Sequence, residues 1–198
     1  MVLPSAYLPP ISWFTALVGG EPILIEQHEN YIKQTLRNRC TIDSPNGPLH
    51  LSIPIDKSNF VMGKCPMKDI VISTHSDWQR QHWYALETTY FNSPFFEYLQ
   101  DDFRPIYERE WRYLIDLNEA LISTCCDLLD ISPTLVRTPH YMGITRLEPK
   151  TLATSSAPSA TIHPRPYYQV FQHKHGFLPD LSIIDLIFNM GKEGVMYL

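Results

Sequence analysis

The segment from residue 26 to residue 40 carries the densest set of side chains able to move a proton or bind an anion. Glu26 and His28 directly follow a short apolar run. An imidazole titrates near neutral pH, and a neighbouring carboxylate fixes its tautomer and raises its basicity. We therefore predict Glu26 and His28 as catalytic acid–base residues. The alternative for His28 is a loop histidine held by hydrogen bonds.

Cations in the same segment predict a site for an anion. Lys33, Arg37 and Arg39 share one face if the chain is extended there, because side chains of a strand alternate. Arginine suits a phosphate or carboxylate, since its planar guanidinium binds with two parallel hydrogen bonds. The alternative is a solvated strand face paired with local acids. The predicted substrate-binding residues are Tyr7, Asn30, Lys33, Arg37, Asn38, Arg39 and Asn189.

Two of these residues lie outside the dense segment. Tyr7 stands on a proline-rich turn, where it would either contact the ligand or close the core. Asn189 lies one helical turn after Asp185, so both side chains could face one polar partner. A hydroxyl at Ser182 and an acid three residues later predict the start of that helix, and Gly191 predicts its end. For Asp185 alone we favour a structural role.

The elements that position residue 26 form a predicted β-α-β unit. A short strand at residues 2–3, a helix at 11–18 and a strand at 23–25 follow one another, and a glycine pair ends the helix. Two parallel strands open their following loops at the same edge of the sheet. Open α/β sheets bind ligands at that edge, so the architecture supports a site at the dense segment.

The rest of the chain predicts one α/β domain over residues 1–198, with a mostly parallel, Rossmann-like sheet flanked by helices and an added β-hairpin. The hairpin joins strands at 40–42 and 49–55 through an Asn-Gly turn. We further expect strands at 69–73 and 134–138. A helix should start with a capping box at Ser76, and another should start at Ser93-Pro94. The leucine spacing predicts a third helix at about 111–129 with one buried stripe. A Ser/Thr/Ala-rich stretch at about 150–162 predicts a mobile loop, after which the C-terminal segment docks back.

Composition limits the classes of partner. Sixteen basic and 21 acidic residues give a net charge of −5, which argues against nucleic acid and membrane surfaces as partners. The four cysteines lack metal-binding spacing, so we expect reduced thiols in a cytoplasmic protein. The expected partner is a small anionic substrate, and the sequence leaves open a homodimer. No cofactor is predicted, although acyl-CoA or a nucleotide-activated donor would serve as a substrate.

Three histidines near the C-terminus raise a metal site as an alternative. His173 and His175 would share one face of a strand, an arrangement that zinc uses. No third ligand stands at a recognisable spacing from them or from His163, and Lys174 adds positive charge. We predict no metal, and the role of these three histidines stays open.

Five blocks in order resemble the WbqC-like family of bacterial proteins. They are residues 4–14, residues 31–39, the turn at 45–47, a group around His82-Trp83, Tyr90, residues 93–96 and Leu117-Asn118, and residues 177–191. The resemblance implies a cytoplasmic enzyme or accessory factor for O-antigen and other surface polysaccharides. The chain departs from the family pattern at Gln27 and His28, where acids are usual, and at Lys192, where proline is usual. An acid at position 28 therefore has no counterpart here.

Three hypotheses follow from the residues and the resemblance. The first is a transferase that modifies an activated sugar or amino-sugar precursor, with acyl or aminoacyl transfer to an amino sugar as the reaction. The second is a nucleotidylyltransferase-like fold that lacks the His-x-Gly-His motif, since the turn reads Pro9-Pro10-Ile11-Ser12. The third is a non-catalytic binding or assembly factor, whose aromatic residues would form an exposed patch.

Overall fold

A three-stranded parallel sheet organises the N-terminal part of the chain. The computed structural model describes residues 1–145 and 165–198, so the predicted loop at 150–162 and His163 lie outside the described residues. Strands β1 (Val2–Pro4), β2 (Ile23–Glu26) and β7 (Leu135–Arg137) pair in the order β1-β2-β7, all parallel. Helix α1 (Ile11–Thr15) connects the first two. This confirms the predicted β-α-β unit and its parallel strands.

The remaining strands of the described chain form two separate antiparallel pairs. Strands β3 (Arg39–Ile42) and β4 (Leu49–Ser52) make the predicted hairpin, and β5 (Ile55–Asp56) pairs with β6 (Val71–Ile72). Gly47 takes a φ of 96° in the hairpin turn, a conformation that glycine adopts without steric cost. The fold is mixed α/β in a single domain, with a small parallel sheet in place of the mostly parallel one predicted; a Rossmann-like strand order is not confirmed.

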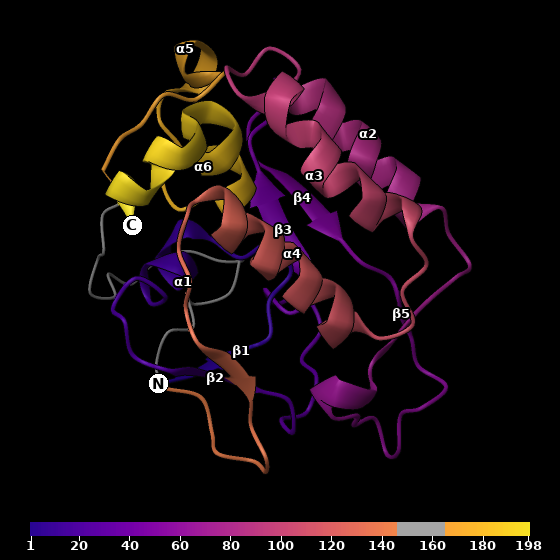
Figure 1. The fold of residues 1–198 in the computed structure, drawn as a ribbon. Helices are drawn as coiled ribbons and strands as arrows, with labels where there is room; N and C mark the ends of the chain where they lie inside the picture. The colour runs from indigo at the N-terminus through magenta and orange to yellow at the C-terminus, as the bar shows by residue number, and fades with distance from the viewer. Residues whose placement is uncertain (146–164) are drawn as a thin grey trace.

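Helices cover these sheets (Figure 1). The helical elements are α2 (Trp78–Tyr90), α3 (Phe96–Glu108), α4 (Leu114–Leu128), α5 (Gln172–His175) and α6 (Ile183–Met190), with 3₁₀ turns η1 (Met67–Asp69) and η2 (Gly191–Tyr197). Helix α4 crosses the middle of the molecule and buries the stripe that the leucine spacing predicted. No described helix has the length and apolar character needed to cross a bilayer.

Two helix starts differ from the sequence prediction. The side chain of Asp77, before α2, makes no capping hydrogen bond, and the predicted box from residue 76 is not formed. Helix α3 begins at Phe96, after a turn that contains Pro94. In that turn, the N–H of Phe95 donates to the carbonyl of Phe188 at 3.0 Å. A tertiary contact with α6 therefore sets this boundary in place of the local start signal.

The C-terminal segment is tied to the start of the chain. The N–H of Ile11 donates to the carbonyl of Leu181 at 3.1 Å, and the N–H of Ile183 donates to the carbonyl of Pro9 at 2.8 Å. Helix α6 is almost wholly buried, and Phe188 packs against the rings of α2 and α3. The segment thus forms part of the core that supports the sheet.

Candidate functional site

Glu26, the last residue of β2, is held by donors from two segments. Its Oε1 accepts from the N–H of His28 at 2.7 Å and from the hydroxyl of Thr138 at 2.9 Å, and its Oε2 accepts from the N–H of Met142 at 2.7 Å. Burial raises the pKa of this carboxyl, but the hydrogen bonds from Met142, His28 and Thr138 outweigh burial and leave the pKa below its usual value. Glu26 is therefore an ionised, fully buried anchor of the sheet edge.

His28 lies half-buried beside this anchor. Its Nε2 stands 3.1 Å from the carbonyl oxygen of Thr138, an arrangement in which the ring nitrogen donates. A proton on Nε2 leaves Nδ1 as the acceptor of the neutral ring. Nδ1 makes no hydrogen bond within residues 1–145 and 165–198, so it keeps its lone pair to accept a proton; His28 is not one of the residues that line the groove between α4 and β7.

Arg37 binds Glu29 with two hydrogen bonds. Its Nε donates to Oε1 at 2.8 Å and its Nη2 to Oε2 at 2.6 Å, and the exposed fractions of the two side chains are 1% and 8%. The segment at 31–38 consists of turns, so the expected extended face does not exist. Thr35 and Arg37 point inward and Lys33 outward. The ion pair gives Arg37 a structural partner at the sheet edge.

The other predicted binding residues around this segment take different positions. Lys33 and Asn30 are exposed. Arg39 is half-buried on β3, with its Nε donating to the hydroxyl of Ser52 at 2.8 Å. Asn38 is buried, and its amide donates to the carbonyl of Ile53 at 2.8 Å. Lys33 and Arg39 are thus the cations of the predicted set that solvent reaches.

Asn118 of helix α4 contacts two of the segments that follow the strands of the parallel sheet. The amide of this side chain donates to the hydroxyl of Ser5 and to the carbonyl of Arg37, both at 2.9 Å. Asn118 therefore joins the turn after β1 to the segment that carries the ion pair. The Oδ1 atoms of Asn118 and Asn38 are buried and accept no hydrogen bond from any described residue. Such acceptors are sites for an ordered water or a ligand donor.

Tyr7 and Asn189 lie in separate networks, and no hydrogen bond of the described chain joins either to His28. The hydroxyl of Tyr7 lies 2.8 Å from Nδ1 of His82 and 2.8 Å from the hydroxyl of Tyr107, all in the core. Burial lowers the pKa of His82 to about 4. Asn189 donates from its amide to the carbonyl of Asp185 at 2.8 Å on α6.

Asp185 forms the centre of the second network. It accepts from the hydroxyls of Tyr90 at 2.8 Å and Tyr167 at 2.6 Å and from the amide of Gln169 at 3.2 Å. Burial is the largest influence on this carboxyl and raises its pKa to about 6, against the lowering effect of the hydroxyl donors. The tyrosines come from α2 and from the segment before α5, so Asp185 holds the C-terminal segment in place.

The histidines of α5 do not lie on a strand, contrary to the expectation. His175 contacts Asp43 at 3.1 Å, and His173 bonds the nearby carbonyl of Val170. Within the described ranges, no group of three or more His, Cys, Asp or Glu side chains could hold a metal. His175 therefore contacts a carboxylate, and His173 makes a local turn contact.

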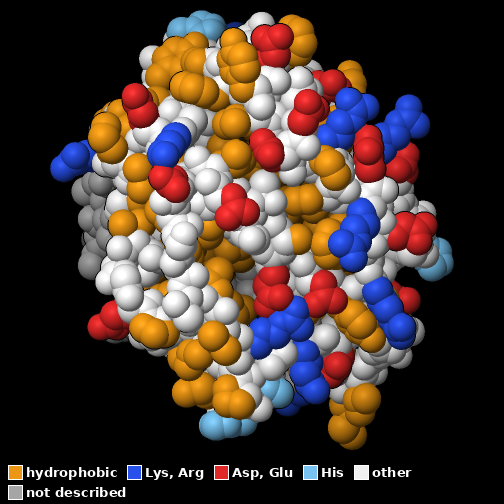
Figure 2. Space-filling model, viewed as in Figure 1, with side chains coloured by type: hydrophobic (Ala, Val, Ile, Leu, Met, Phe, Trp, Pro, Cys, Tyr) orange, Lys and Arg blue, Asp and Glu red, His pale blue; other side chains and the backbone are white. Residues whose placement is uncertain are grey.

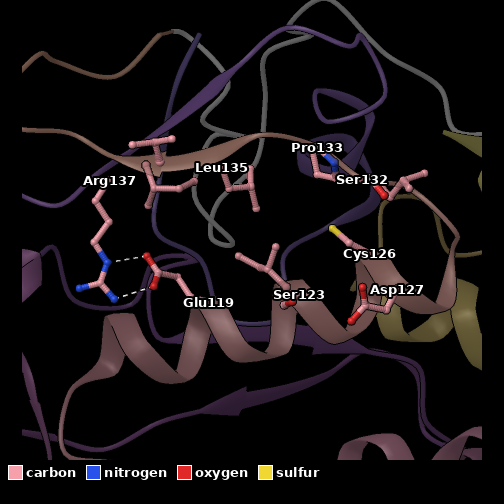
Figure 3. Close-up of a pocket in the computed structure, with 12 residues that line it drawn as sticks. Glu119, Ser123, Cys126, Asp127, Ser132, Pro133, Leu135 and Arg137 are labelled. Carbon is pink, nitrogen blue, oxygen red and sulfur yellow. Dashed lines mark hydrogen bonds and ion pairs between the residues drawn. The ribbon is translucent and has the colours of Figure 1, made fainter.

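A groove of about 510 Å³ runs between α4 and the edge strand β7. Figure 2 shows a hollow near the centre of this face, lined by apolar side chains. Arg137 and Glu119 face each other at one end, and Cys126 and Asp127 lie at the other (Figure 3). Burial raises the pKa of Cys126 to about 12, so it is a thiol and not a nucleophile. Ile25, Ile122 and Leu135 also line the groove.

Arg137 is shared by two carboxylates of α4. Its Nε and Nη2 donate to Glu119 at 2.7 and 2.5 Å, and Nη2 also donates to Asp116 at 2.6 Å. The sequence interpretation missed this group. The sequence does contain a sign of this group: two acids three residues apart on a helix, followed by an arginine at the end of the next strand. That Arg137 pairs with these acids is evident only from the packing of α4 on β7.

Two acids share one base at the Arg137 end of the groove. The carboxylates of Asp116 and Glu119 both contact the guanidinium group of Arg137. An excess of buried or half-buried carboxylate attracts a cationic group and repels an anion. The geometry therefore favours an amine near the groove, with anion binding left to the more exposed Lys33 and Arg39.

Comparison with a family model identifies the family of this chain. The family model described as the WbqC-like protein family matches residues 5–157. An uncharacterised protein of Mycobacterium tuberculosis, Rv1507c, is 27% identical over 227 aligned positions, which cover 100% of this chain and 96% of the relative. No solved structure matches the chain. Because the family model spans most of the described N-terminal region and continues past it, the chain belongs to the WbqC-like protein family.

Proposed function

We propose that the protein is a transferase that modifies an activated amino-sugar precursor of a surface polysaccharide, by acyl or aminoacyl transfer to its amine. The observation that carries this proposal is the groove between α4 and β7, which ends in the acid-rich cluster around Arg137. A volume of about 510 Å³ suits a small molecule. Membership of the WbqC-like family supports a role in surface polysaccharide synthesis, because the name of that family is associated with O-antigen and related polysaccharides.

The chemistry of the groove fits an amino sugar as the acceptor. Ile25, Ile122 and Leu135 offer apolar surface to a sugar ring. Glu119 lines the groove and would attract the ammonium group, with Asp116 beside the same guanidinium group of Arg137. Binding as an ammonium ion places the nitrogen next to the carboxylates. The nitrogen must then lose a proton before it attacks the acyl carbon.

His28 is the base in this proposal. The first proton of the ammonium group is lost to solvent. As the new N–C bond forms, the bond from the acyl carbon to the leaving group breaks, the leaving group departs with the electron pair, and the second proton passes from the nitrogen to Nδ1 of His28. The Thr138 carbonyl holds the other ring nitrogen in its protonated form. Glu26 accepts three hydrogen bonds and fixes the backbone of His28, so we assign it a positioning role.

Lys33 and Arg39 would hold the anionic part of the donor, such as the phosphates of acyl-CoA or of a nucleotide. Both have exposed surface, and neither forms an ion pair with a described residue, whereas Arg37 binds Glu29. A phosphate gains most from a guanidinium that still has donors to offer. In this proposal Tyr7, Asn38 and Asn189 stabilise the core and do not contact the ligand.

The test begins with thermal unfolding of the purified protein in the presence of nucleotide sugars, amino-sugar nucleotides, acyl-CoA and amino acids. A ligand of the folded state stabilises it by about 2.7 kcal/mol at a hundredfold excess over Kd. We expect Glu119→Gln to weaken an amine ligand about tenfold or more, and Asp127→Asn, at the other end of the groove, to leave it unchanged.

Turnover is then measured with the ligand pair that binds. His28→Gln should lower kcat by a hundredfold or more, since general-base catalysis contributes about that much. His140→Gln changes an exposed histidine in the segment after β7 and should have no effect. Equal rates for the His28 and His140 variants would exclude His28 as the base. No stabilisation by any compound would instead favour the binding or assembly factor.

A further inference from the structure

A narrow hairpin projects from the loop between β5 and η1. The N–H of Val61 donates to the carbonyl of Lys64 at 2.9 Å, and the N–H of Lys64 donates back to the carbonyl of Val61 at 2.9 Å. Met62 and Gly63, between them, have φ values of 50° and 77°. Two consecutive positive φ values in a two-residue loop define a type I′ turn. We call residues 60–64 the finger.

Met62 is an unfavourable residue for this position by two criteria. A type I′ turn favours Asn, Asp or Gly at its first central position, because a larger side chain is strained at positive φ. The side chain of Met62 is also 97% exposed, and that of Val61 is 74% exposed. Met62 does not stabilise the turn, and neither Met62 nor Val61 makes the protein more soluble. Strain combined with exposed apolar surface points to a function for the tip.

Basic residues surround the finger in a protein that is acidic overall. Lys57 and Lys64 are exposed in the same loop, and Lys68 is exposed in η1, which follows it. The N–H of Tyr31 donates to the carbonyl of Cys65 at 2.8 Å, which places the turn after Tyr31 beside the finger. That turn adds the half-exposed Ile32 and the exposed Lys33.

The acids in this region do not cancel the lysines. They are Asp56, which accepts from the N–H of Ser58 at 2.8 Å, and Asp69, which lies 3.9 Å from Lys68. Four exposed lysines therefore stand against two acids, although the whole chain has a net charge of −5. Val61 and Met62 are exposed, and no residue of the finger lines the groove. The net charge around the finger is therefore positive, whereas that of the whole chain is negative.

We propose that the finger docks the protein onto an anionic lipid bilayer. A stable protein interface needs about 800 Å² from each partner around a packed centre, which a projecting point of two side chains does not offer. A bilayer accepts such a point, with Val61 and Met62 among the acyl chains and the lysines at the lipid phosphates. The turn satisfies two of its own backbone donors internally, which lowers the cost of insertion.

This docking is a surface association and needs no spanning helix. The expectation of no membrane partner rested on the net charge of the whole chain, and the finger is a local exception to it. The finger itself contributes no residue to the groove. Lys33 is used by both proposals, so the docking is tested at Met62 and Lys64.

The experiment is flotation of the full chain with vesicles of phosphatidylcholine alone and with added phosphatidylserine. We expect binding only to the anionic vesicles, and loss of binding at high salt. Met62→Asn should reduce binding about tenfold while raising Tm, because Asn relieves the turn. Phe91→Asn, a change at a 70% exposed apolar residue of another loop, should leave binding unchanged.

Lysine variants test the electrostatic part. Lys64→Ser should weaken binding about fivefold, whereas Lys192→Ser, which removes an exposed lysine far along the chain, should not weaken it. Failure to bind anionic vesicles, or equal binding by the Met62 variant, would overturn the proposal. Sedimentation velocity covers the rival occupant: a dimer that Met62→Asn dissociates would assign the finger to a second copy of the chain.

Discussion

Glu26 and Asp185 are both carboxylates without exposed surface, and each accepts three hydrogen bonds, yet their pKa values move in opposite directions. Burial raises the pKa of both. At Glu26, two of the donors are backbone N–H groups, and they hold the pKa below its usual value. At Asp185, burial prevails and the carboxylate of Asp43 adds to it, so the pKa is about 6.

The difference separates two kinds of polar core. The sheet edge is built to keep charge, since its carboxylates face backbone donors and guanidinium groups. The network on α6 is built from hydroxyls and an amide, and it holds a carboxyl that takes up a proton just below neutral pH. The sheet edge is therefore the region suited to bind a charged substrate, whereas the Asp185 network joins segments of the chain.

The largest expected effect comes from removing the guanidinium at the sheet edge. Arg37→Met leaves Glu29 buried without its two hydrogen bonds, and we expect a loss of about 3–5 kcal/mol in the free energy of unfolding, measured by urea denaturation. The matched Arg39→Met affects a half-buried side chain on a strand and should cost less than about 1 kcal/mol. Similar losses in both would contradict the special role of the buried pair.

A neutral isostere should distinguish the two carboxylates directly. Glu26→Gln places an amide nitrogen against N–H donors, so we expect a loss of about 2 kcal/mol near pH 7. Asp185→Asn should change the free energy of unfolding by less than about 1 kcal/mol, because hydroxyls can turn to accept and no buried charge remains. If the Asn variant were the less stable of the two, the comparison would fail.

The pH dependence should differ in sign between these variants. The pKa of Asp185 is raised from 3.8 to about 6 in the folded protein, so its stabilising contribution is complete below about pH 4 and is lost as the pH rises through 6. Wild type should therefore gain up to about 3 kcal/mol over Asp185→Asn as the pH falls from neutral to 4. The lowered pKa of Glu26 predicts the reverse, a wild-type advantage that is lost as the pH falls through its folded value.

His82 is the reason to measure differences between variants and not the wild type alone. Burial lowers its pKa from 6.5 to about 4, so its contribution is present above pH 6.5 and is lost as the pH falls toward 4. That loss opposes the gain at Asp185 over the same range. A flat pH profile of the wild type would thus be compatible with two large opposing contributions.

The smallest effect is expected at the ion pair between Lys192 and Asp130, which is 2.7 Å long but has both side chains about 70% exposed. Solvent and salt screen such a pair, so Lys192→Ser should leave Tm within experimental error. A clear drop in Tm would mean that exposure is a poor guide to the strength of charge pairs in this chain.

The sequence predicted elements whose signal is local. The leucine spacing located α4, and the Asn-Gly turn located the β3–β4 hairpin. Helix α1 ends at Thr15, before the glycine pair that was expected to end it. The pairing of β2 with β7 was not predictable in the same way, because more than a hundred residues separate the two strands. Helix α3 starts late for the same kind of reason, a bond to Phe188.

The candidate site shows the same division. A concentration of charge at residues 26–40 identified the region, and His28 does lie at the carboxyl edge of the sheet. The pattern could not tell that Arg37 turns inward to Glu29, since the alternation rule applies only to an extended chain. Nor could it join Arg137 to the acids of α4.

The hydrogen bonds that tie Leu181 and Ile183 to Ile11 and Pro9 also fix when the protein can fold during translation. The helix after β1 lacks its partner until residues near 183 have left the ribosome. Contacts this distant along the chain make folding slow, because a large loop must close before they form. The nascent N-terminal unit therefore waits with apolar surface exposed, and chaperone binding should be strongest on chains stopped short of α6.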